Sequence, residues 1–254
     1  MTVEDCIISS KKNIAKGIFD IWVKCPQIAL EAKPGQFVDV KCNNFTLRRP
    51  ISICEIDEKK GLIRLVFEVR GEGTDWLSGK NEGDCVDLLG PLGNGFMLGK
   101  TDRPAVFVGG GIGVPPLLAE AKLFGSKATV IMGFRSAGAV ILKEDFEQVG
   151  AAVTVCTDDG TFGRHGLVSV PFEERLDAAS CAVVFACGPK PMLKAVAESC
   201  EKHGIACFVS MEERMACGVG ACLSCACKVK YEGEEKYFHV CKNGPIFNAK
   251  TIVW

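Results

Sequence analysis

The sequence predicts a multidomain β plus α/β fold: an antiparallel β-barrel over residues 1–99, a Rossmann-like parallel α/β domain over residues 100–209, and a small C-terminal domain over residues 210–254. Three observations predict it. The first part of the chain holds short Val-, Ile- and Phe-rich runs between turn residues, and the middle part alternates such runs with helical segments. The last part carries closely spaced cysteines, a pattern typical of a metal-binding loop.

Short apolar runs form the expected barrel. Turns such as Lys33-Pro34-Gly35 and Asn81-Glu82-Gly83-Asp84 separate them, and no long helical pattern interrupts them. Strands this short and this closely spaced are typical of a small closed antiparallel barrel. A short helix is expected at Thr74–Ser78. We expect the strands at Val3–Ser9, Gly17–Val23, Gln36–Val40, Ile51–Ile56, Leu62–Val69 and Cys85–Leu89.

The middle of the chain alternates strands and helices, which indicates βαβ units and a parallel sheet. Gly204 follows the last helix of this region, where it is a suitable C′ residue. The expected strands are Ala105–Val108, Ala128–Met132, Ala152–Cys156, Ala182–Ala186 and Ala206–Ser210, and the expected helices are Pro116–Phe124, Leu142–Gln148 and Pro191–His203.

Four cysteines of the C-terminal part have the spacing of a plant-type [2Fe–2S] site. Cys217, Cys222 and Cys225 follow the pattern C-x4-C-x2-C, and Cys241 follows later, after an expected strand at Tyr237–Val240. The loop glycines allow the sharp turns that bring three thiolates to one small cluster. A structural zinc site and a set of unliganded thiols are the alternatives, but zinc sites usually take their cysteines as two close pairs, and Cys241 stands alone.

Composition narrows the classes of function. The net charge is −1 and there is no Lys/Arg block, which argues against a nucleic-acid partner. The start of the chain has no apolar core of signal-peptide length, and the most apolar stretch, residues 105–121, is interrupted by glycines and prolines, so we expect no membrane segment. The fifteen cysteines are therefore interpreted as reduced thiols of a cytoplasmic protein.

Two motifs of the expected barrel resemble the flavin domain of the ferredoxin–NADP reductase superfamily. They are Arg49-Pro50-Ile51-Ser52 and Arg70-Gly71-Glu72-Gly73-Thr74; each alone could be only a barrel corner. The resemblance implies that FAD contacts the first motif, Gly73 and Thr74 of the second, and the strand Val66-Phe67-Glu68. Arg49 would contact the phosphate region, Ser52 the reactive ring edge, and Gly73 and Thr74 the pyrophosphate. Relatives usually have Tyr-Arg where this chain has Phe67-Glu68, so a cation is missing there unless Arg70 replaces it.

The resemblance continues in the α/β region. A glycine-rich turn at Gly109–Gly113 ends one strand and precedes a helix, where open α/β folds bind a pyrophosphate, although it does not match G-x-G-x-x-G. It is similar to the turn that begins the superfamily's nicotinamide domain, and Cys187-Gly188-Pro189 is similar to a second turn facing the nicotinamide. The resemblance implies NAD contacts at Gly110, Gly111, Gly113, Cys187, Gly188 and Pro189. Arg135 is as compatible with an ordinary surface residue as with a ribose-phosphate contact, so it does not decide between NAD and NADP.

Over its whole length the chain resembles the electron-transfer subunits of class 1B dihydroorotate dehydrogenases. The segments that carry this resemblance include Glu212–Cys222 and Cys241–Pro245, with Asn243 where Asp is common. The family implies one FAD, one [2Fe–2S] cluster and NAD as co-substrate, and an FMN-containing catalytic partner in an assembly of two plus two subunits. Electrons from the partner's reduced FMN would reach NAD⁺ through the cluster and FAD, in pyrimidine biosynthesis. No catalytic side chain is implied here, and the three histidines lie in no catalytic motif.

Two other functions remain open. Related flavin and iron–sulfur subunits serve bifurcating ferredoxin–NADP, sulfide or hydrogenase complexes, and some of them replace a cluster cysteine with Asp. All four cysteines are present here, which favours the dihydroorotate dehydrogenase family. The non-enzyme alternative is a zinc-stapled binding module on a reductase-like fold.

Overall fold

The computed structural model describes residues 1–96, 103–176 and 181–254, and its contacts divide the chain into two compact units. The predicted boundary between residues 99 and 100 lies outside the described residues, and the division into three domains stays a prediction. The first unit comprises Met1–Phe96, Glu212–Cys227 and Tyr237–Pro245, and the second comprises Met97–Met211, Lys228–Lys236 and Ile246–Trp254.

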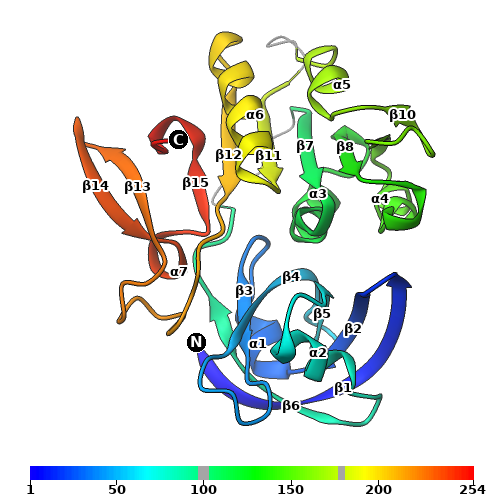
Figure 1. Ribbon diagram of the computed structural model, residues 1–254, viewed down its shortest axis with the longest axis vertical. Helices are drawn as coiled ribbons and strands as arrows, with labels where there is room; N and C mark the ends of the chain where they lie inside the picture. The colour runs from blue at the N-terminus through cyan, green and yellow to red at the C-terminus, as the bar shows by residue number, and fades with distance from the viewer. Residues whose placement is uncertain (97–102, 177–180) are drawn as a thin grey trace. The chain divides into compact units, whose positions relative to one another are not determined.

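The first unit contains a closed antiparallel barrel of six strands in the order β1-β2-β5-β4-β3-β6 (Figure 1). Its strands are β1 (Thr2–Ala15), β2 (Ile18–Lys24), β3 (Phe37–Val40), β4 (Arg49–Asp57), β5 (Leu62–Glu68) and β6 (Cys85–Leu92). The predicted short helix is present as α2 (Glu72–Ser78). A second helix, α1 (Pro26–Glu31), was not predicted, because six residues are too few to display a helical period.

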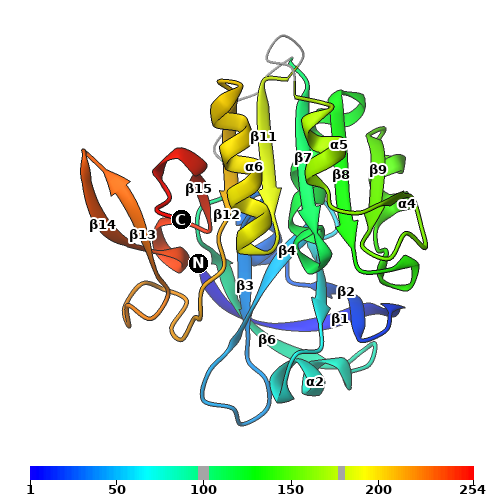
Figure 2. The same ribbon diagram turned by 45° about the horizontal axis from the view of Figure 1, so that its top comes forward.

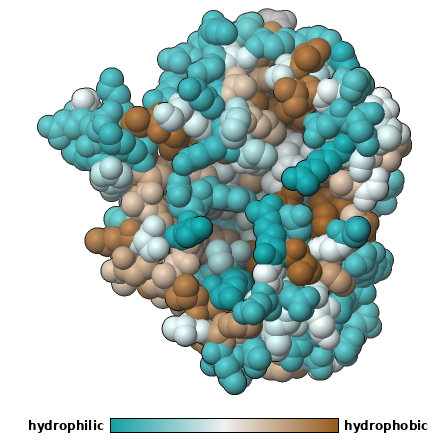
Figure 3. Space-filling view, in the orientation of Figure 1, coloured by the Kyte–Doolittle hydropathy of each residue, from teal (hydrophilic) through white to brown (hydrophobic). Residues whose placement is uncertain are grey.

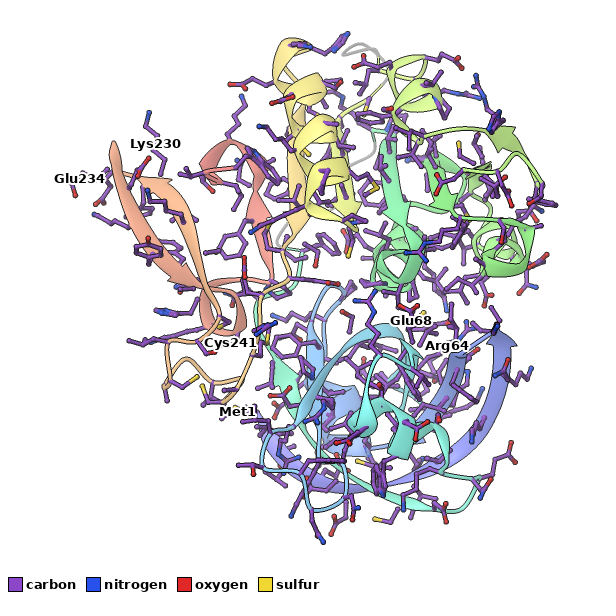
Figure 4. The ribbon with its side chains drawn as sticks, viewed as in Figure 1. Met1, Arg64, Glu68, Lys230, Glu234 and Cys241 are labelled. Carbon is purple, nitrogen blue, oxygen red and sulfur yellow. The ribbon has the colours of Figure 1, made fainter. Side chains whose placement is uncertain are left out.

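Alternation along β5 separates the barrel core from the outer face. Ile63, Leu65 and Phe67 belong to the buried apolar cluster inside the barrel. The residues between them point the other way, since successive side chains of a strand face opposite sides. On this outer side Arg64 binds Asp20 with two nitrogen–oxygen contacts, Nε–Oδ1 at 3.0 Å and Nη2–Oδ2 at 2.8 Å (Figure 4). Arg64 and Asp20 are both buried, and their opposite charges compensate each other there.

The second unit contains a seven-stranded sheet in the order β10-β9-β8-β7-β11-β12-β15. All neighbours are parallel except β15, which runs antiparallel to β12. Helix α3 packs against α4 and helix α5 against α6, and Figure 2 shows α5 and α6 in front of the sheet. The strands are β7 (Ala105–Gly110), β8 (Ala128–Phe134), β9 (Ala152–Thr157), β10 (Arg164–His165), β11 (Val183–Cys187), β12 (Ala206–Ser210) and β15 (Ile246–Asn248), and the helices are α3 (Leu118–Phe124), α4 (Lys143–Gln148), α5 (Ser169–Glu173) and α6 (Lys190–Lys202).

One predicted helix begins differently from the expectation. The chain after β7 first makes two 3-10 turns, at Gly111–Gly113 and Pro115–Leu117, and only then enters α3. Proline has no amide hydrogen and does not fit in the interior of an α-helix, so α3 starts after the two consecutive prolines. The short elements β10 and α5 were not predicted.

The C-terminal segment forms a hairpin and a single helical turn. Strands β13 (Ala226–Tyr231) and β14 (Glu234–His239) pair with each other, and their exposed end is hydrophilic in the space-filling view (Figure 3). The strand predicted to run to Val240 ends at His239, and Cys241 lies instead on the turn α7 (Val240–Asn243). No helix among the described residues is long and apolar enough to cross a membrane. The barrel and the parallel α/β sheet confirm the two large parts of the predicted fold class.

Candidate functional site

The loop that carries three of the predicted cluster ligands is shaped by left-handed backbone. Gly218, Gly220 and Leu223 have φ of 67°, 82° and 61°. These turns point amide groups inward: the N–H groups of Ala221 and Cys222 donate to Cys217 Sγ at 3.2 and 3.4 Å. Glycine adopts such a conformation at little cost, which explains two of the three positions.

The four predicted ligand thiols lie as two pairs. Cys225 Sγ is 3.3 Å from Cys241 Sγ and accepts a hydrogen bond from the Cys241 amide at 3.4 Å. Cys217 and Cys222 form the other pair through a side-chain hydrogen bond. Among the described residues, no three His, Cys, Asp or Glu side chains converge on one metal-ion position. Four cysteine thiolates are the ligand set of a [2Fe–2S] cluster, and these four residues would hold it.

The pKa values of Cys217 and Cys241, one cysteine from each pair, are shifted in opposite directions. Burial by itself raises the pKa of Cys217, but the amide groups of Cys222, Val219 and Ala221 outweigh it and lower that pKa to about 6. Burial, together with the adjacent Cys225 thiol, raises the pKa of Cys241 to about 12. Cys217 is therefore prepared to be a thiolate, while Cys241 needs the positive charge of a metal to lose its proton. Figure 4 shows Cys241 at the turn α7.

The barrel contacts both ligand segments within the first unit. A Cβ added to Gly218 would overlap Asp39 Oδ2 and lie 3.1 Å from its Cγ and 3.2 Å from Leu92 Cδ1. On the other segment, Asn94 Nδ2 donates to the carbonyl oxygens of Lys242 and Asn243, both at 3.1 Å. The Asn94 amide also donates to the Gly244 carbonyl at 2.6 Å. Barrel residues thus fix the backbone next to Cys217 and next to Cys241.

The departure at Asn243 preserves a structural contact. Its Oδ1 accepts a hydrogen bond from the His239 amide at 2.9 Å, at the start of α7. An aspartate oxygen in the same place would accept the same bond. The substitution therefore changes charge near the cluster segment without removing this link.

Two of the predicted FAD residues are brought together. The Arg49 guanidinium lies directly against Gly73, where an added Cβ would be 2.7 Å from Arg49 Cζ. The guanidinium also lies over the Phe45 ring, 5.1 Å from the ring centre, and donates to the Leu47 carbonyl. A planar fork beside bare backbone is suited to bind a phosphate. The neighbouring Arg48 is instead used in the barrel, where it binds Asp87 at 2.7 Å.

The loop before α2 is held by the Thr74 hydroxyl. Thr74 Oγ1 accepts from the Arg70 amide at 2.9 Å and donates to the Gly71 carbonyl at 3.0 Å. Arg70 Nε binds Glu68 Oε2 at 2.7 Å (Figure 4 labels Glu68). Because this ion pair neutralises Glu68, the acidic departure leaves no isolated negative charge beside the predicted phosphate site.

The remaining predicted FAD residues lie on β4 and β5. Pro50 is exposed, Ser52 is half-buried, and Ile51 is buried in the barrel core. Val66 is buried on the outer side of β5, whereas the Phe67 ring stacks on Phe19 at 5.8 Å within the core. The side chain of Phe67 therefore packs inward, and its backbone is the part left to face a ligand.

The two predicted NAD turns contact each other in the second unit. A Cβ on Gly113 would lie 2.6 Å from the Cys187 carbonyl carbon and 2.7 Å from Gly188 Cα. A Cβ on Gly110 would lie 2.9 Å from Pro189 Cδ. Strands β7 and β11 are paired with Gly109 opposite Cys187, so both turns leave the same edge of the sheet. Gly111 has a φ of 54°, a left-handed conformation. Only glycine allows the backbones to approach this closely.

Sequence reasoning missed two residues of the site, Asp39 and Asn94. Asp39 is a charged residue in the buried strand Phe37–Val40, and this could have been noticed as a signal. Asn94 lies in a glycine-rich loop, where Asn is common for conformational reasons, so the sequence gives no sign of its contacts.

The chain is similar to known proteins, both in its C-terminal segment and over nearly its whole length. A family model described as the iron-sulfur cluster binding domain of dihydroorotate dehydrogenase B matches residues 212–253, which confirms the predicted C-terminal cluster domain. The dihydroorotate dehydrogenase B (NAD(+)) electron transfer subunit of Geobacillus kaustophilus is 42% identical over 258 residues, with 98% of each chain covered. The subunit of the same description from Streptococcus mutans is 40% identical over 257 residues, again with 98% of each chain covered.

Solved structures show the same fold. The structure of NADH-dependent reduced ferredoxin-NADP oxidoreductase, described for flavin-based electron bifurcation, has a TM-score of 0.86 at 30% identity and covers 98% of this chain and 89% of that chain. A ferredoxin NADP+ reductase from Neisseria gonorrhoeae with bound FAD and NADP has a TM-score of 0.65 at 13% identity, covering 80% of this chain and 92% of that chain. The second likeness shows the fold alone.

Proposed function

The chain belongs to the family of dihydroorotate dehydrogenase B (NAD(+)) electron transfer subunits, and on that premise we propose that it carries electrons from a dihydroorotate-oxidising partner to NAD⁺ in pyrimidine biosynthesis. It is thus an NAD-linked oxidoreductase subunit whose substrate site lies on the partner. One observation supports the proposal most strongly. Four cysteines lie as two pairs, Cys217 with Cys222 and Cys225 with Cys241, against the same barrel in which Arg49 lies against Gly73.

The residues of the chain fit FAD, a [2Fe–2S] cluster and NAD. When bound, the cluster exchanges single electrons, FAD exchanges single electrons or pairs, and the nicotinamide exchanges a hydride. The four cysteines hold the cluster, and the amide groups of Ala221 and Cys222 stabilise negative charge on Cys217. Arg49 binds a phosphate group of FAD against Gly73.

The NAD contacts come from two turns of the second unit that contact each other, one after β7 and one after β11. Gly110, Gly111 and Gly113 present bare backbone at the end of β7, and Cys187, Gly188 and Pro189 lie beside them. A nicotinamide nucleotide bound there would meet the backbone amide groups of the glycines.

The partner completes the enzyme. The family name specifies an electron transfer subunit and therefore a second, catalytic chain. We infer from the resemblance to this family that the second chain contains FMN and that two copies of each subunit assemble. The fifteen cysteines, none of them in a disulfide, are consistent with a reducing cytoplasm.

Replacing one cluster ligand tests this function. Cys222→Ser should abolish electron transfer from dihydroorotate to NAD⁺ in the reconstituted complex, and should leave NADH oxidation by an artificial dye acceptor intact. Cys85→Ser is the matched control, because Cys85 is an exposed thiol of β6 away from the ligand set. Dihydroorotate-dependent NAD⁺ reduction at the unaltered rate in Cys222→Ser would refute the assignment.

One observation favours a second candidate. The electron-bifurcating oxidoreductase structure matches the full chain at a TM-score of 0.86, so a ferredoxin–NADP partner is the alternative. The curated dihydroorotate dehydrogenase relatives are more similar, at 42% against 30% identity. Affinity purification of the chain from its own cell separates the two: co-purification with a dihydroorotate-oxidising flavoprotein supports the first, and co-purification with a second NADPH-dependent flavoprotein supports the other.

A further inference from the structure

Asp39 is a buried carboxylate in the middle of the barrel wall. Its residue is only 2% exposed, and it lies on β3, opposite Pro50 of β4 and Leu89 of β6. Val38 and Val40 belong to the apolar core. Since side chains alternate along a strand, Asp39 points away from the core, to the outer face of the barrel.

On that face the carboxylate meets the cluster-binding loop. Asp39 Oδ2 lies against Gly218, next in sequence to the ligand Cys217. Its other oxygen, Oδ1, is buried and accepts no hydrogen bond within the described chain. A buried carboxylate oxygen without a hydrogen-bond donor is unusual and costs free energy, so a group that approaches it from outside the chain's own donors would be stabilised there.

The negative charge of Asp39 is only partly balanced. Burial raises its pKa to about 6, and the nearby Arg48 opposes this rise. Arg48 donates to the backbone carbonyl of Asp39 at 3.2 Å and forms its ion pair with Asp87. The guanidinium therefore binds the Asp87 carboxylate and the Asp39 backbone, and at pH 8 the buried Asp39 carboxylate adds a negative charge beside the cluster loop.

The same strand pair connects this charge to the flavin motif. Asp39 is the cross-strand partner of Pro50, which lies within the Arg49–Ser52 motif on β4. A single carboxylate thus lies next to both predicted cofactor segments. The potential of an iron–sulfur cluster depends on net charge, hydrogen bonds and exposure around it.

We propose that Asp39 is a positioning residue of the electron-transfer site: its carboxylate seats the Cys217–Gly218 backbone and its negative charge lowers the reduction potential of the bound cluster. The inference rests on the proposed function, because it requires that the four cysteines hold a [2Fe–2S] cluster. Reduction adds an electron to the cluster, and a neighbouring negative charge disfavours it. Removing the charge should make the cluster easier to reduce.

The test is a redox titration at pH 8 of the full chain, loaded with FAD and cluster, followed by electron paramagnetic resonance of the reduced cluster. Asp39→Asn and Asp39→Ser should both shift the midpoint to a more positive potential, with about a fivefold higher ratio of reduced to oxidised cluster at a fixed potential. Glu58→Gln is the control: Glu58 is exposed in the turn that follows β4, so this variant changes the net charge equally but should leave the midpoint in place.

Each outcome decides the matter. An unchanged midpoint in a fully loaded Asp39→Asn or Asp39→Ser chain would overturn the proposal, while the cluster signal itself would leave the proposed function standing. Loss of FAD and cluster together in both variants would also overturn it, because it would mark Asp39 as a residue needed for the barrel alone. An unaltered chain that gives no iron–sulfur signal after reconstitution would instead contradict the proposed function.

Discussion

Gly218→Ala is expected to remove most of the cluster from the chain while FAD remains bound. Two costs act together. Gly218 has a φ of 67°, where an L-residue pays roughly 1–2 kcal/mol. The new Cβ would also overlap Asp39 Oδ2 and approach Leu92 Cδ1 to 3.2 Å, and overpacking of this kind typically costs about 1–3 kcal/mol. The sum, about 2–5 kcal/mol against the native loop, corresponds to at least a thirtyfold loss of cluster affinity.

The measurement is iron and acid-labile sulfide per chain, with FAD per chain as the internal standard. Gly17→Ala is the matched control: Gly17 has a φ of 72° in the same unit, and nothing lies within 4 Å of its added Cβ. This control pays the backbone cost alone and should keep its cluster. A second cycle adds Asp39→Ala to Gly218→Ala, which removes the overlap and should restore part of the cluster content. Full cluster content in Gly218→Ala would show that the loop does not bind the cluster in this conformation.

Three further predictions concern the other sites. Arg49→Lys keeps a positive charge but loses the planar fork beside Gly73, so the dissociation constant of FAD should rise about tenfold or more, measured by flavin fluorescence on dilution; an unchanged constant would remove Arg49 from the FAD site. Gly113→Ala would press on Cys187 and should raise the KM for NADH with FAD and cluster content unaltered, whereas Gly138→Ala, with open space around it, should not. Burial raises the pKa of Glu120 to about 7, above its unfolded value of 4.5, so folding favours its protonated form and stability falls as pH rises through 7. Glu120→Gln should therefore gain stability over the unaltered chain between pH 5 and pH 8, by up to about 3 kcal/mol in thermal melts; a constant difference across that range would contradict this.

The sequence predicted those parts of the fold that local chemistry determines. Alternating apolar runs predicted the barrel strands. Two turns were each predicted to contact NAD, and the structure adds that they contact each other at Gly113 and Cys187, because parallel strands end at one edge. Element ends were less predictable. Helix α3 begins later than predicted, after Pro115 and Pro116. Cys241 was predicted to follow a strand directly, but it lies on a helical turn. Both differences involve hydrogen-bonding geometry at a chain reversal, which residue preferences express only weakly.

The contacts between distant segments could not be predicted in this way. Arg48 and Arg49 are adjacent and chemically alike, yet one binds Asp87 inside the barrel wall and the other lies against Gly73. Only the strand register decides which of two neighbouring side chains faces which side. The same holds for Asp39, whose partner Gly218 is far away in the sequence.

The cluster segments depend on the barrel for their support. The ligand loop has little apolar core of its own, since Ala221, Cys222, Leu223 and Ser224 are exposed. Segments as short as Glu212–Cys227 and Tyr237–Pro245 rarely fold alone without a metal or another source of stability. Barrel residues provide it here: Asp39 and Leu92 lie against Gly218, and Asn94 binds the segment after Cys241. The first unit accordingly joins residues 1–96 with both ligand segments. Cluster binding should therefore depend on the barrel. A substitution at Asn94 should lower the iron content of the chain more than its FAD content.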